Sequence, residues 1–442
     1  MPTTPDAIVI GGGFAGLSAA TALVEAGRGV LLLESRPRLG GRATAFRDPV
    51  TGESIDNGQH VLAGCYTETL KLLRRLGTVT SLHRPSALRV PMIDEAGLSS
   101  VLSLPPLPSP LHLLAGVLSW DALSVADRLS VLRFARVLRR RTAPDGTLTV
   151  RAWLERYGQS PRLCRMLWEP LALATLNQSI DEAGALSFFA VISRMFGPEP
   201  DASAVLLPAV PLDELYALPA AAFLESAGAA VLTNVRPRVM VSGDAAIGVQ
   251  LGDELIQTRV VLSAVPWYAV ADLFGEIPLA LQPITEAASR LASRPIVTVN
   301  LWFDGLGLDN PMTGLPGRDF QWVFDKQSLL GSAHSHLSLV SSAADAICAR
   351  SNDELIHLAA HELSAALPRF RGTAPRHASV VRERRATFSL RPGGPSRPPT
   401  ETAVPGFLLA GDWIDTGLPA TIESAVVSGH QAAAVALKIL ST

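Results

Sequence analysis

The sequence predicts an α/β fold with a mostly parallel sheet assembled from three separated chain segments and an inserted α+β domain. Near the N-terminus, a glycine-rich turn joins a short apolar run to an Ala-rich helical run. A second apolar run leads to an acid at residues 407–412, and residues 229–267 read as short strands separated by Gly-Asp turns. With 442 residues, 48% of them hydrophobic and 18% charged, the chain is long enough for two domains.

The opening stretch DAIVIGGGFAGLSAATALVEAGRGVLLLES predicts strand, turn, helix and strand. The apolar run Ala7–Ile10 is typical of a buried strand, Leu17–Ala26 has helical spacing, and Val30–Leu33 ends in Glu34. In the GxGxxG motif the first glycine makes a tight turn, the second lets the backbone approach a pyrophosphate, and the third allows close helix packing. We therefore predict a Rossmann-like dinucleotide site formed by Gly11, Gly13, Phe14, Ala15 and Gly16, with Glu34 and Ser35 at a ribose that carries no 2'-phosphate.

The stretch SRPRLGGRATAF follows the second predicted strand. Gly40 and Gly41 would let the chain pass close to a bound cofactor, and Arg42 can pair with a diphosphate. A surface turn with an exposed Arg is the alternative interpretation. From here the chain resembles the flavoprotein group that includes amine oxidases, phytoene desaturases and Rab GDP-dissociation inhibitors. In that group the equivalent GGR lies along the flavin and the diphosphate, so the resemblance implies FAD.

The C-terminal stretch LLAGDWIDTGLPATIESA predicts a second cofactor contact. An extended FAD cannot be held by one helix N-terminus, because its flavin ring lies far from its adenosine end. The strand Phe407–Ala410 delivers Asp412 at its carboxyl end, and a helix is expected to start near Pro419. The resemblance carries Gly411 and Asp412 onto the ribityl and diphosphate contact. It also points the helix N-terminus, with Ala420, Thr421 and Ile422, at the flavin pyrimidine oxygen.

Residues 229–267 predict an antiparallel meander that returns to a parallel strand at Val260–Ala264. The resemblance places the backbone near Val239 against the adenine edge. We therefore expect an FAD-binding domain made of residues 1–79, 220–267 and 401–442. The inserts, residues 80–219 and 268–400, are expected to form the substrate-binding domain.

Three longer stretches resemble one narrower family: IDNGQHVLAGCYTETLKLLRRLG at residues 55–77, WEPLALATLNQ at 168–178 and GDWIDTGLPATIESAVVSG at 411–429. This is the family of squalene-associated FAD-dependent desaturases, the hydroxysqualene dehydroxylases of bacterial hopanoid synthesis. The likeness extends over nearly the whole chain. It implies that the allylic hydroxyl of hydroxysqualene is protonated and that reduced flavin delivers hydride, which gives squalene, water and oxidised FAD. Gly58 and Gln59 of the DNGQH segment are then expected beside the cofactor.

Hydroxide is a poor leaving group, so this reaction needs a general acid close to the flavin. An apolar lipid tunnel would raise the pKa of a carboxyl group and keep it protonated near neutral pH. Asp56, His60 and Asp415 are the candidates. Each has a structural alternative, because Asp56 can cap the turn before Gly58, His60 can be a core histidine, and Asp415 can cap the loop before the last helix.

Three other functions are open to a chain of this kind. An amine oxidase needs an aromatic cage beside the flavin through which the amine passes. This function is disfavoured, because the chain has only four Tyr and none lies near the C-terminal motif. A carotenoid or phytoene-type desaturase would oxidise a polyene. A non-catalytic prenyl-lipid binder is less consistent with Glu34, Arg42 and Asp412 all in place. Only one GxGxxG motif is present, so no separate NADPH-binding domain is evident. The electron donor that reduces the flavin is therefore left open.

Composition and the N-terminal sequence bear on two questions, which partners are expected and which cellular compartment the protein occupies. A net charge of -2 gives no electrostatic footprint for nucleic acid, so no nucleic-acid partner is expected. The three cysteines Cys65, Cys164 and Cys348 lack CxxC spacing and fit a reducing compartment. The N-terminus lacks a basic stretch before its first apolar run, so a cytoplasmic protein is expected.

Two features of the inserts have competing interpretations. Leu98–Trp120 contains no charged residue, but Pro105, Pro106, Pro108 and Pro110 break any spanning helix. It is either part of the core or a peripheral contact with the inner face of a membrane that admits an isoprenoid lipid. His357 and His361 have the i, i+4 spacing of metal ligands, but no third ligand is evident. A solvated helix is favoured there, and no metal site is predicted.

Overall fold

The computed structural model describes residues 4–85, 89–105, 107, 111–197, 199 and 201–441. It begins with β1 (Ala7–Ile10), α1 (Phe14–Glu25) and β2 (Val30–Leu33). The two predicted strands are confirmed at their predicted bounds. The helix starts three residues earlier than its apolar spacing indicated, directly after Gly13, so the last three residues of the GxGxxG motif lie in its first turn.

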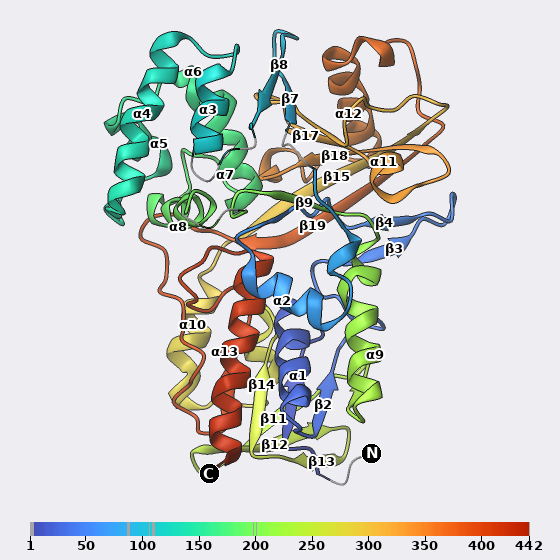
Figure 1. The fold of residues 1–442 in the computed structure, drawn as a ribbon. Helices are drawn as coiled ribbons and strands as arrows, with labels where there is room; N and C mark the ends of the chain where they lie inside the picture. Colours follow the sequence, from blue (N-terminus) through green and yellow to red (C-terminus); the bar gives the residue numbers. More distant parts are fainter. Residues whose placement is uncertain are drawn as a thin grey trace.

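A five-stranded parallel sheet forms the lower body of the molecule (Figure 1). Its order is β10-β2-β1-β14-β20, where β10 is Ala230–Leu232, β14 is Val260–Ser263 and β20 is Phe407–Leu409. All four pairs of neighbouring strands in it are parallel. The sheet thus joins the three chain segments that the sequence indicated. Parallel neighbours place their carboxyl ends at one edge, and the predicted cofactor residues follow these ends.

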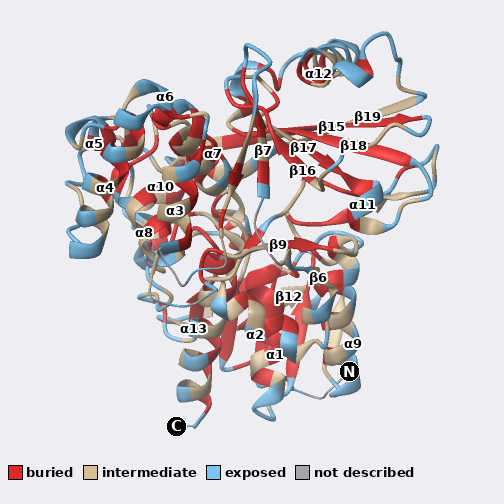
Figure 2. Cartoon of the chain, turned by 45° about the horizontal axis from the view of Figure 1, so that its top comes forward, coloured by how far each residue is buried: buried red, intermediate tan, exposed pale blue. Residues whose placement is uncertain are grey.

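Helices cover one face of this sheet and a meander covers the other. The helices are α1, α9 (Leu218–Ser226) and α13 (Ile422–Ser441), which share a buried apolar cluster. On the opposite face lie β11 (Arg238–Ser242), β12 (Ala245–Leu251) and β13 (Glu254–Gln257), paired antiparallel as predicted. Figure 2 shows the strands of the parallel sheet largely buried.

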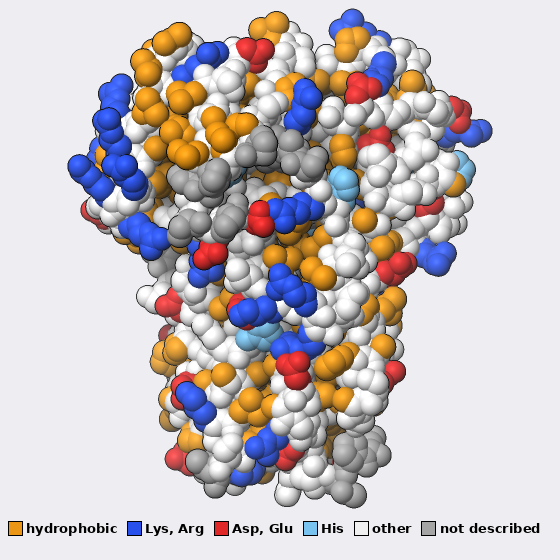
Figure 3. Space-filling view, viewed as in Figure 1, with side chains coloured by type: hydrophobic (Ala, Val, Ile, Leu, Met, Phe, Trp, Pro, Cys, Tyr) orange, Lys and Arg blue, Asp and Glu red, His pale blue; other side chains and the backbone are white. Residues whose placement is uncertain are grey.

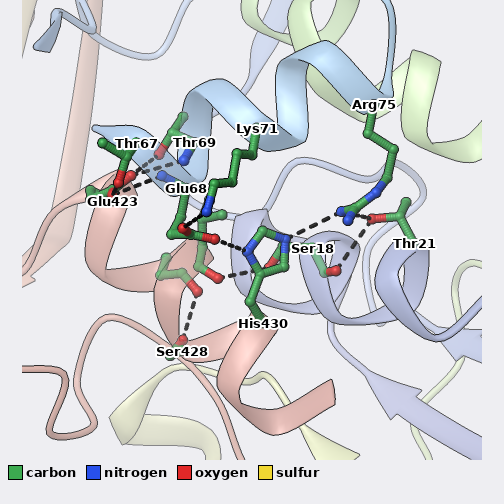
Figure 4. A network of polar contacts seen from close by, with 12 residues as sticks. Ser18, Thr21, Thr67, Glu68, Thr69, Lys71, Arg75, Glu423, Ser428 and His430 are labelled. Carbon is green, nitrogen blue, oxygen red and sulfur yellow. Dashed lines mark hydrogen bonds and ion pairs between the residues drawn. The ribbon is translucent and has the colours of Figure 1, made fainter. Parts of the chain in front are cut away.

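The first and last segments of the chain are joined at α1, α13 and α2 (Thr67–Arg75). A Cβ at Gly429 of α13 would lie 2.2 Å from the Ala15 carbonyl oxygen, so α13 and α1 touch through their backbones. Figure 4 shows the polar contacts beside them. The buried Glu423 carboxylate accepts the backbone N–H groups of Glu68 (3.0 Å) and Thr69 (2.9 Å), which satisfies donors that a helix start leaves free.

The upper body contains a seven-stranded sheet in the order β19-β15-β18-β17-β16-β7-β8. These strands are His377–Phe388, Ser293–Phe303, Ser335–Ser341, Trp322–Asp325, Met312–Gly314, Arg89–Ile93 and Ser99–Ser103. Helix α12 (Asn352–Ala366) packs on one face around a buried apolar cluster. The other face turns toward the lower body, where β3 (Ala45–Arg47) and β4 (Ser54–Asp56) run between the two bodies (Figure 1).

A group of helices packs beside the upper sheet. Its core contains three buried tryptophans and one buried phenylalanine: Trp120, Trp153, Trp168 and Phe134. Its helices are α3 (Leu111–Ser119), α4 (Val125–Arg140), α5 (Val150–Arg156), α6 (Pro161–Leu163), α7 (Glu169–Leu176) and α8 (Ala185–Met195). A small sheet of β5 (Leu62–Ala63), β9 (Val205–Pro208) and β6 (Leu82–His83) lies under them. The helical group is the part of the molecule in which the stretch Leu98–Trp120 ends.

The structure bears on two expectations, the domain boundary after residue 267 and the stretch Leu98–Trp120. Helix α10 (Gln282–Ser289) contributes to the cluster on the lower sheet, although a boundary after residue 267 was expected, so the domain limits remain a prediction. The stretch Leu98–Trp120 forms β8 and α3, and Leu113 and Leu114 pack partly buried against the helical core. Pro106, Pro108 and Pro110 lie outside the described residues. Of the helices that the structure describes, none is long and apolar enough to cross a membrane.

Candidate functional site

The GxGxxG loop turns tightly at the carboxyl end of β1. Gly11 has a φ of +108°, which favours glycine, and a Cβ at Gly16 would lie 1.8 Å from the Gly11 carbonyl oxygen. Only glycine therefore fits the start of α1 at this position. A Cβ at Gly13 would meet no atom closer than the Gly41 Cα, at 3.7 Å. The loop and helix start present a backbone surface of the kind that a diphosphate needs.

Glu34 lies at the carboxyl end of β2, as predicted, and is 6% exposed. Its carboxylate accepts hydrogen bonds from the Gly12 N–H (2.7 Å), the Arg36 N–H (2.8 Å) and the Ser35 hydroxyl (3.2 Å). Glu34 therefore fixes the glycine loop as well as the chain that follows β2. The N–H of Val235 donates to the Glu34 carbonyl oxygen at 3.0 Å, which brings the second chain segment to the same place.

The GGR loop packs directly on the glycine loop. The Gly40 N–H donates to the Gly12 carbonyl oxygen at 2.8 Å, and Gly40 and Gly41 have φ angles of +117° and +58°. Tyr216 holds this arrangement, because its hydroxyl lies 2.5 Å from the Gly40 oxygen and 2.7 Å from the Ala43 oxygen. Burial raises the pKa of Tyr216, so the phenol keeps the proton that it donates.

Phe14 stacks on the Tyr216 ring with the ring centres 3.6 Å apart. Phe14 thus packs beneath the loop, and Ala15 lies buried beside it in the first turn of α1. Tyr216 was not among the predicted site residues, and it is 176 residues from Gly40. It belongs to a segment that the sequence assigned to the other domain, and no spacing pointed to it.

Arg42 is paired with Asp412 at 2.5 Å, between the first and the last chain segments. Its guanidinium also donates to the Ala386 carbonyl oxygen at 2.9 Å and lies over the Trp267 ring at 5.2 Å. Burial by itself lowers the pKa of Arg42, but the neighbouring Asp412 carboxylate raises it above its ordinary value. The two residues expected at the diphosphate and ribityl contacts therefore lie together at one edge of the parallel sheet.

The start of α13 lies beside this pair. Gly411 has a φ of +140°, and its N–H donates to the Ser428 hydroxyl at 2.7 Å. The Thr421 hydroxyl accepts the Ser424 N–H at 3.1 Å and so caps the helix that begins at Ile422. Ala420, Thr421 and Ile422 are all partly buried. The expected helix start near Pro419 is confirmed to within a few residues.

Val239 is buried in β11, where its side chain joins the apolar cluster on the parallel sheet. A register shift between Met240 and Val241 interrupts the pairing of β11 with β12 next to it. The contact of its backbone with adenine remains a prediction.

A buried ion pair lies where the upper body meets the DNGQH loop. Lys326 starts α11 (Lys326–Leu330), is 2% exposed, and donates to Asp56 Oδ2 (3.0 Å) and Gln59 Oε1 (2.8 Å). The other Asp56 oxygen accepts the Leu212 N–H at 3.0 Å. Lys326 lies 270 residues from Asp56, so the sequence offered no signal for it. A buried charge without its partner is strongly destabilising, which makes the two residues interdependent.

Three polar groups near this pair lack a partner. They are Thr298 Oγ1, Asn300 Nδ2 and Trp322 Nε1, all buried and without a hydrogen bond to the described residues. Thr298 and Trp322 both pair with Val340 of β18, and Asn300 lies two residues along β15, so the three share one face of the sheet. A Cβ at Gly58 would lie 3.7 Å from Thr298 Oγ1, which shows that this face meets the DNGQH loop.

The three acid candidates differ in their surroundings. Asp56 is engaged in the ion pair with Lys326. His60 Nδ1 lies 3.0 Å from the Gly58 carbonyl oxygen, and burial lowers the pKa of His60 although Asp56 opposes this. The Asp415 side chain is 65% exposed and lies 3.6 Å from Arg397. The apolar surroundings expected for Asp415 are therefore not observed, because its loop turns the carboxylate outward.

Two other features of the structure, the His357 and His361 pair and a surface cavity, lie away from this site. His357 and His361 are exposed on α12, and in the part of the chain that the structure describes no group of three or more His, Cys, Asp or Glu could hold a metal ion. A surface cavity between Glu95, Arg318 and Glu362 includes none of the predicted site residues.

The geometry fits an extended dinucleotide cofactor. Two helix starts, α1 and α13, and the GGR loop meet at the carboxyl ends of β1, β2 and β20. A glycine surface for a diphosphate, a buried acid for a ribose and the Arg42–Asp412 pair all lie at this edge. These features define a flavoprotein of the dinucleotide-binding α/β class.

Residues 14–437 match the family described as flavin containing amine oxidoreductase. The chain belongs to this family and is an FAD-dependent oxidoreductase. It is 30% identical over 98% of its length to a hydroxysqualene dehydroxylase from Sinorhizobium fredii, of which it covers 99%, and 30% identical over 97% to one from Rhodopseudomonas palustris, of which it covers 97%. The resemblance to this group is confirmed.

Two further similarities are more distant. A zeta-carotene desaturase from Solanum lycopersicum is 25% identical over 96% of this chain and 80% of its own length. A structure of a putrescine oxidase variant superimposes with a TM-score of 0.74 at 18% identity, covering 98% of this chain and 99% of that one. The latter shows that the fold is shared.

Proposed function

We propose that the protein catalyses the FAD-dependent reductive dehydroxylation of hydroxysqualene, an isoprenoid lipid, to squalene. Similarity to two hydroxysqualene dehydroxylases along the whole chain supports this substrate. The observation that carries the proposal is the buried ammonium group of Lys326 beside the DNGQH loop. Removal of a hydroxyl group consumes a proton, and an ammonium group has only donors. Desaturation of a polyene instead releases a proton, which an ammonium group cannot accept.

The cofactor residues divide into three groups in this proposal. Gly11, Gly13, Phe14, Ala15 and Gly16 form the diphosphate surface, with Gly40, Gly41 and Arg42 alongside. Glu34 and Ser35 hold the adenosine ribose, and Val239 lies near adenine. Gly411, Asp412, Ala420, Thr421 and Ile422 hold the ribityl chain and pyrimidine end, with Gly58 and Gln59 near the ring. FAD supplies the hydride when it is bound in its reduced form.

Lys326 at the start of α11 would protonate the substrate hydroxyl, and the polar face of the upper sheet would bind it. Lys326 Nζ uses two of its three N–H groups on Asp56 and Gln59, which leaves one for the leaving oxygen. The unpaired groups of Thr298, Asn300 and Trp322 can orient that oxygen. As the carbon–oxygen bond breaks, the proton from Lys326 would complete a water molecule, and bound reduced FAD would supply hydride to the carbon. Asp56 holds Lys326 in position.

This assignment moves the acid role away from the three residues that the sequence suggested. Asp56 is the partner of the proton donor, and the lowered pKa of His60 leaves that ring neutral near neutral pH. Asp415 is exposed and close to Arg397. The roles of all four residues can be separated by mutation.

Lys326→Met is the test of the proposed function. Enzyme reduced anaerobically with dithionite is mixed with hydroxysqualene, and the extracted lipid is identified while flavin reoxidation is followed. Lys326→Met leaves the buried Asp56 carboxylate unpaired and should be less stable than wild type, so Lys326→Met/Asp56→Asn is measured beside it. We expect both variants to retain FAD and to form squalene at least about a hundredfold more slowly than wild type, since a general acid contributes about that much. Lys71→Met, an exposed control, and Asp415→Asn should react at the wild-type rate. A wild-type rate in Lys326→Met, with a slow Asp415→Asn, would return the role to Asp415.

A carotenoid-type desaturase is the second candidate, favoured by the zeta-carotene desaturase match. The same experiment separates the two functions. Reduction of bound FAD by a polyene, with no squalene formed from hydroxysqualene, would assign the protein to the desaturases.

A further inference from the structure

Helix α4 carries an unusual concentration of positive charge. Six arginines lie within it or at its C-terminal end: Arg128, Arg133, Arg136, Arg139, Arg140 and Arg141. The helix has one acidic residue, Asp127, and this forms the capping box with Ser124 and accepts a hydrogen bond from Ser160. None of the six arginines forms an ion pair with another residue that the structure describes. The charge is therefore available to a partner.

The outward face of α4 combines this charge with apolar side chains. Val125 is 70% exposed and Leu129 is 53% exposed, one helical turn apart in the first half of the helix. Arg133, Arg136 and Arg140 continue the exposed side in the second half. Val131 and Phe134 are buried on the opposite side against the helical core.

The apolar part of this face extends onto α3, which packs against α4. Leu111 at the start of α3 is 54% exposed, and Leu107 just before it is 46% exposed. Figure 3 shows Lys and Arg side chains gathered along the edge over α4, beside hydrophobic side chains over α3. Solvation alone explains the arginines but not the neighbouring exposed leucines.

We propose that this face, formed by Leu107, Leu111, Val125, Leu129, Arg136 and Arg140, docks on an anionic lipid bilayer. Arginines at a bilayer surface are attracted by anionic headgroups, and exposed aliphatic side chains enter the boundary between headgroups and acyl chains. A nucleic acid or an acidic protein surface would match the arginines but leave the leucines and Val125 without a partner. The surface is argued from charge and exposure and does not depend on the substrate proposed above.

The test is co-sedimentation of the FAD-loaded protein with vesicles in the absence of any substrate. Vesicles of phosphatidylcholine alone are compared with vesicles that also contain phosphatidylglycerol, at low and high salt. We expect binding to the anionic vesicles that weakens with salt. Arg136→Glu/Arg140→Glu should reduce it by about thirtyfold or more, since each basic residue near an anionic surface contributes about 1 kcal/mol. The exposed Arg290→Glu/Arg371→Glu pair is the control with the same change of charge and should bind as wild type.

A second variant separates the apolar contribution. Val125→Ser/Leu129→Ser should weaken the binding that persists at high salt while the flavin spectrum stays unchanged, because both side chains are exposed. The proposal is overturned if the charge-reversal variant and its control bind equally, if neutral and anionic vesicles bind alike, or if the wild type ignores vesicles and binds duplex DNA.

Discussion

Glu34 has a structural role in the fold and a proposed role at the cofactor. It is buried at the end of β2 and accepts two backbone N–H groups, from Gly12 of the glycine loop and from Arg36. A carboxylate that fixes the loop is also placed where a ribose hydroxyl is expected. Its loss should affect the cofactor more than the rest of the molecule.

Glu34→Arg is therefore expected to weaken FAD binding by about tenfold to a hundredfold, the loss of one hydrogen bond to a charged group. The new cation would also meet no 2'-phosphate. The dissociation constant can be measured by flavin fluorescence on titration of the apoprotein. The exposed Glu286→Arg, which makes the same change of charge, should bind FAD as wild type. Equal affinity in both variants would show that Glu34 does not contact the ribose.

The sequence predicted residues whose partners are near in the chain or belong to a known motif. Gly11, Glu34 and Asp412 follow strands that their apolar runs reveal. Lys326 and Tyr216 could not be found, because their partners are 270 and 176 residues away and neither lies in a spaced motif. The outward turn of Asp415 was missed for a related reason, since its exposure depends on how the loop packs against Arg397.

At the scale of elements, the parallel strands and the meander followed from short apolar runs and Gly-Asp turns. Their pairing order was harder to foresee, because β20 joins β14 across an insert of more than a hundred residues. The position of α10 shows the same limit, since packing on the lower sheet leaves no mark in local periodicity.

A prediction at the scale of elements concerns the contact between helices α2 and α13. This contact depends on the buried carboxylate of Glu423. Glu423→Gln keeps the side chain's size but turns one of its two oxygens into a donor, which then faces the N–H group of either Glu68 or Thr69. We expect a loss of about 1–3 kcal/mol of stability and a melting temperature lower by several degrees. Thermal unfolding followed by circular dichroism measures this. The exposed Glu225→Gln is the control, and equal melting of the two variants would contradict the account.

At the scale of the whole molecule, the proposed function assigns the cofactor to the lower body and the substrate to the upper body. The parallel sheet gathers the cofactor residues at its carboxyl edge, and the upper sheet turns a polar face with unpaired groups toward them. The DNGQH loop touches both, because Asn57 Nδ2 donates to the Arg42 carbonyl oxygen and Asp56 pairs with Lys326. The central claim of the proposed function is that a proton from Lys326 and a hydride from reduced FAD act on the same carbinol group of the substrate.

Deuterium transfer tests this claim most directly. The flavoenzyme is reduced anaerobically in D2O, so that exchangeable positions of the flavin carry deuterium, and is mixed with unlabelled hydroxysqualene for a single turnover. Mass spectrometry of the extracted lipid should show squalene with one deuterium at the former carbinol carbon, formed in a one-to-one ratio with oxidised FAD. The same experiment in H2O should give unlabelled squalene. Squalene without deuterium from the D2O reaction, or FAD that stays reduced in the presence of hydroxysqualene, would contradict reductive dehydroxylation by this protein.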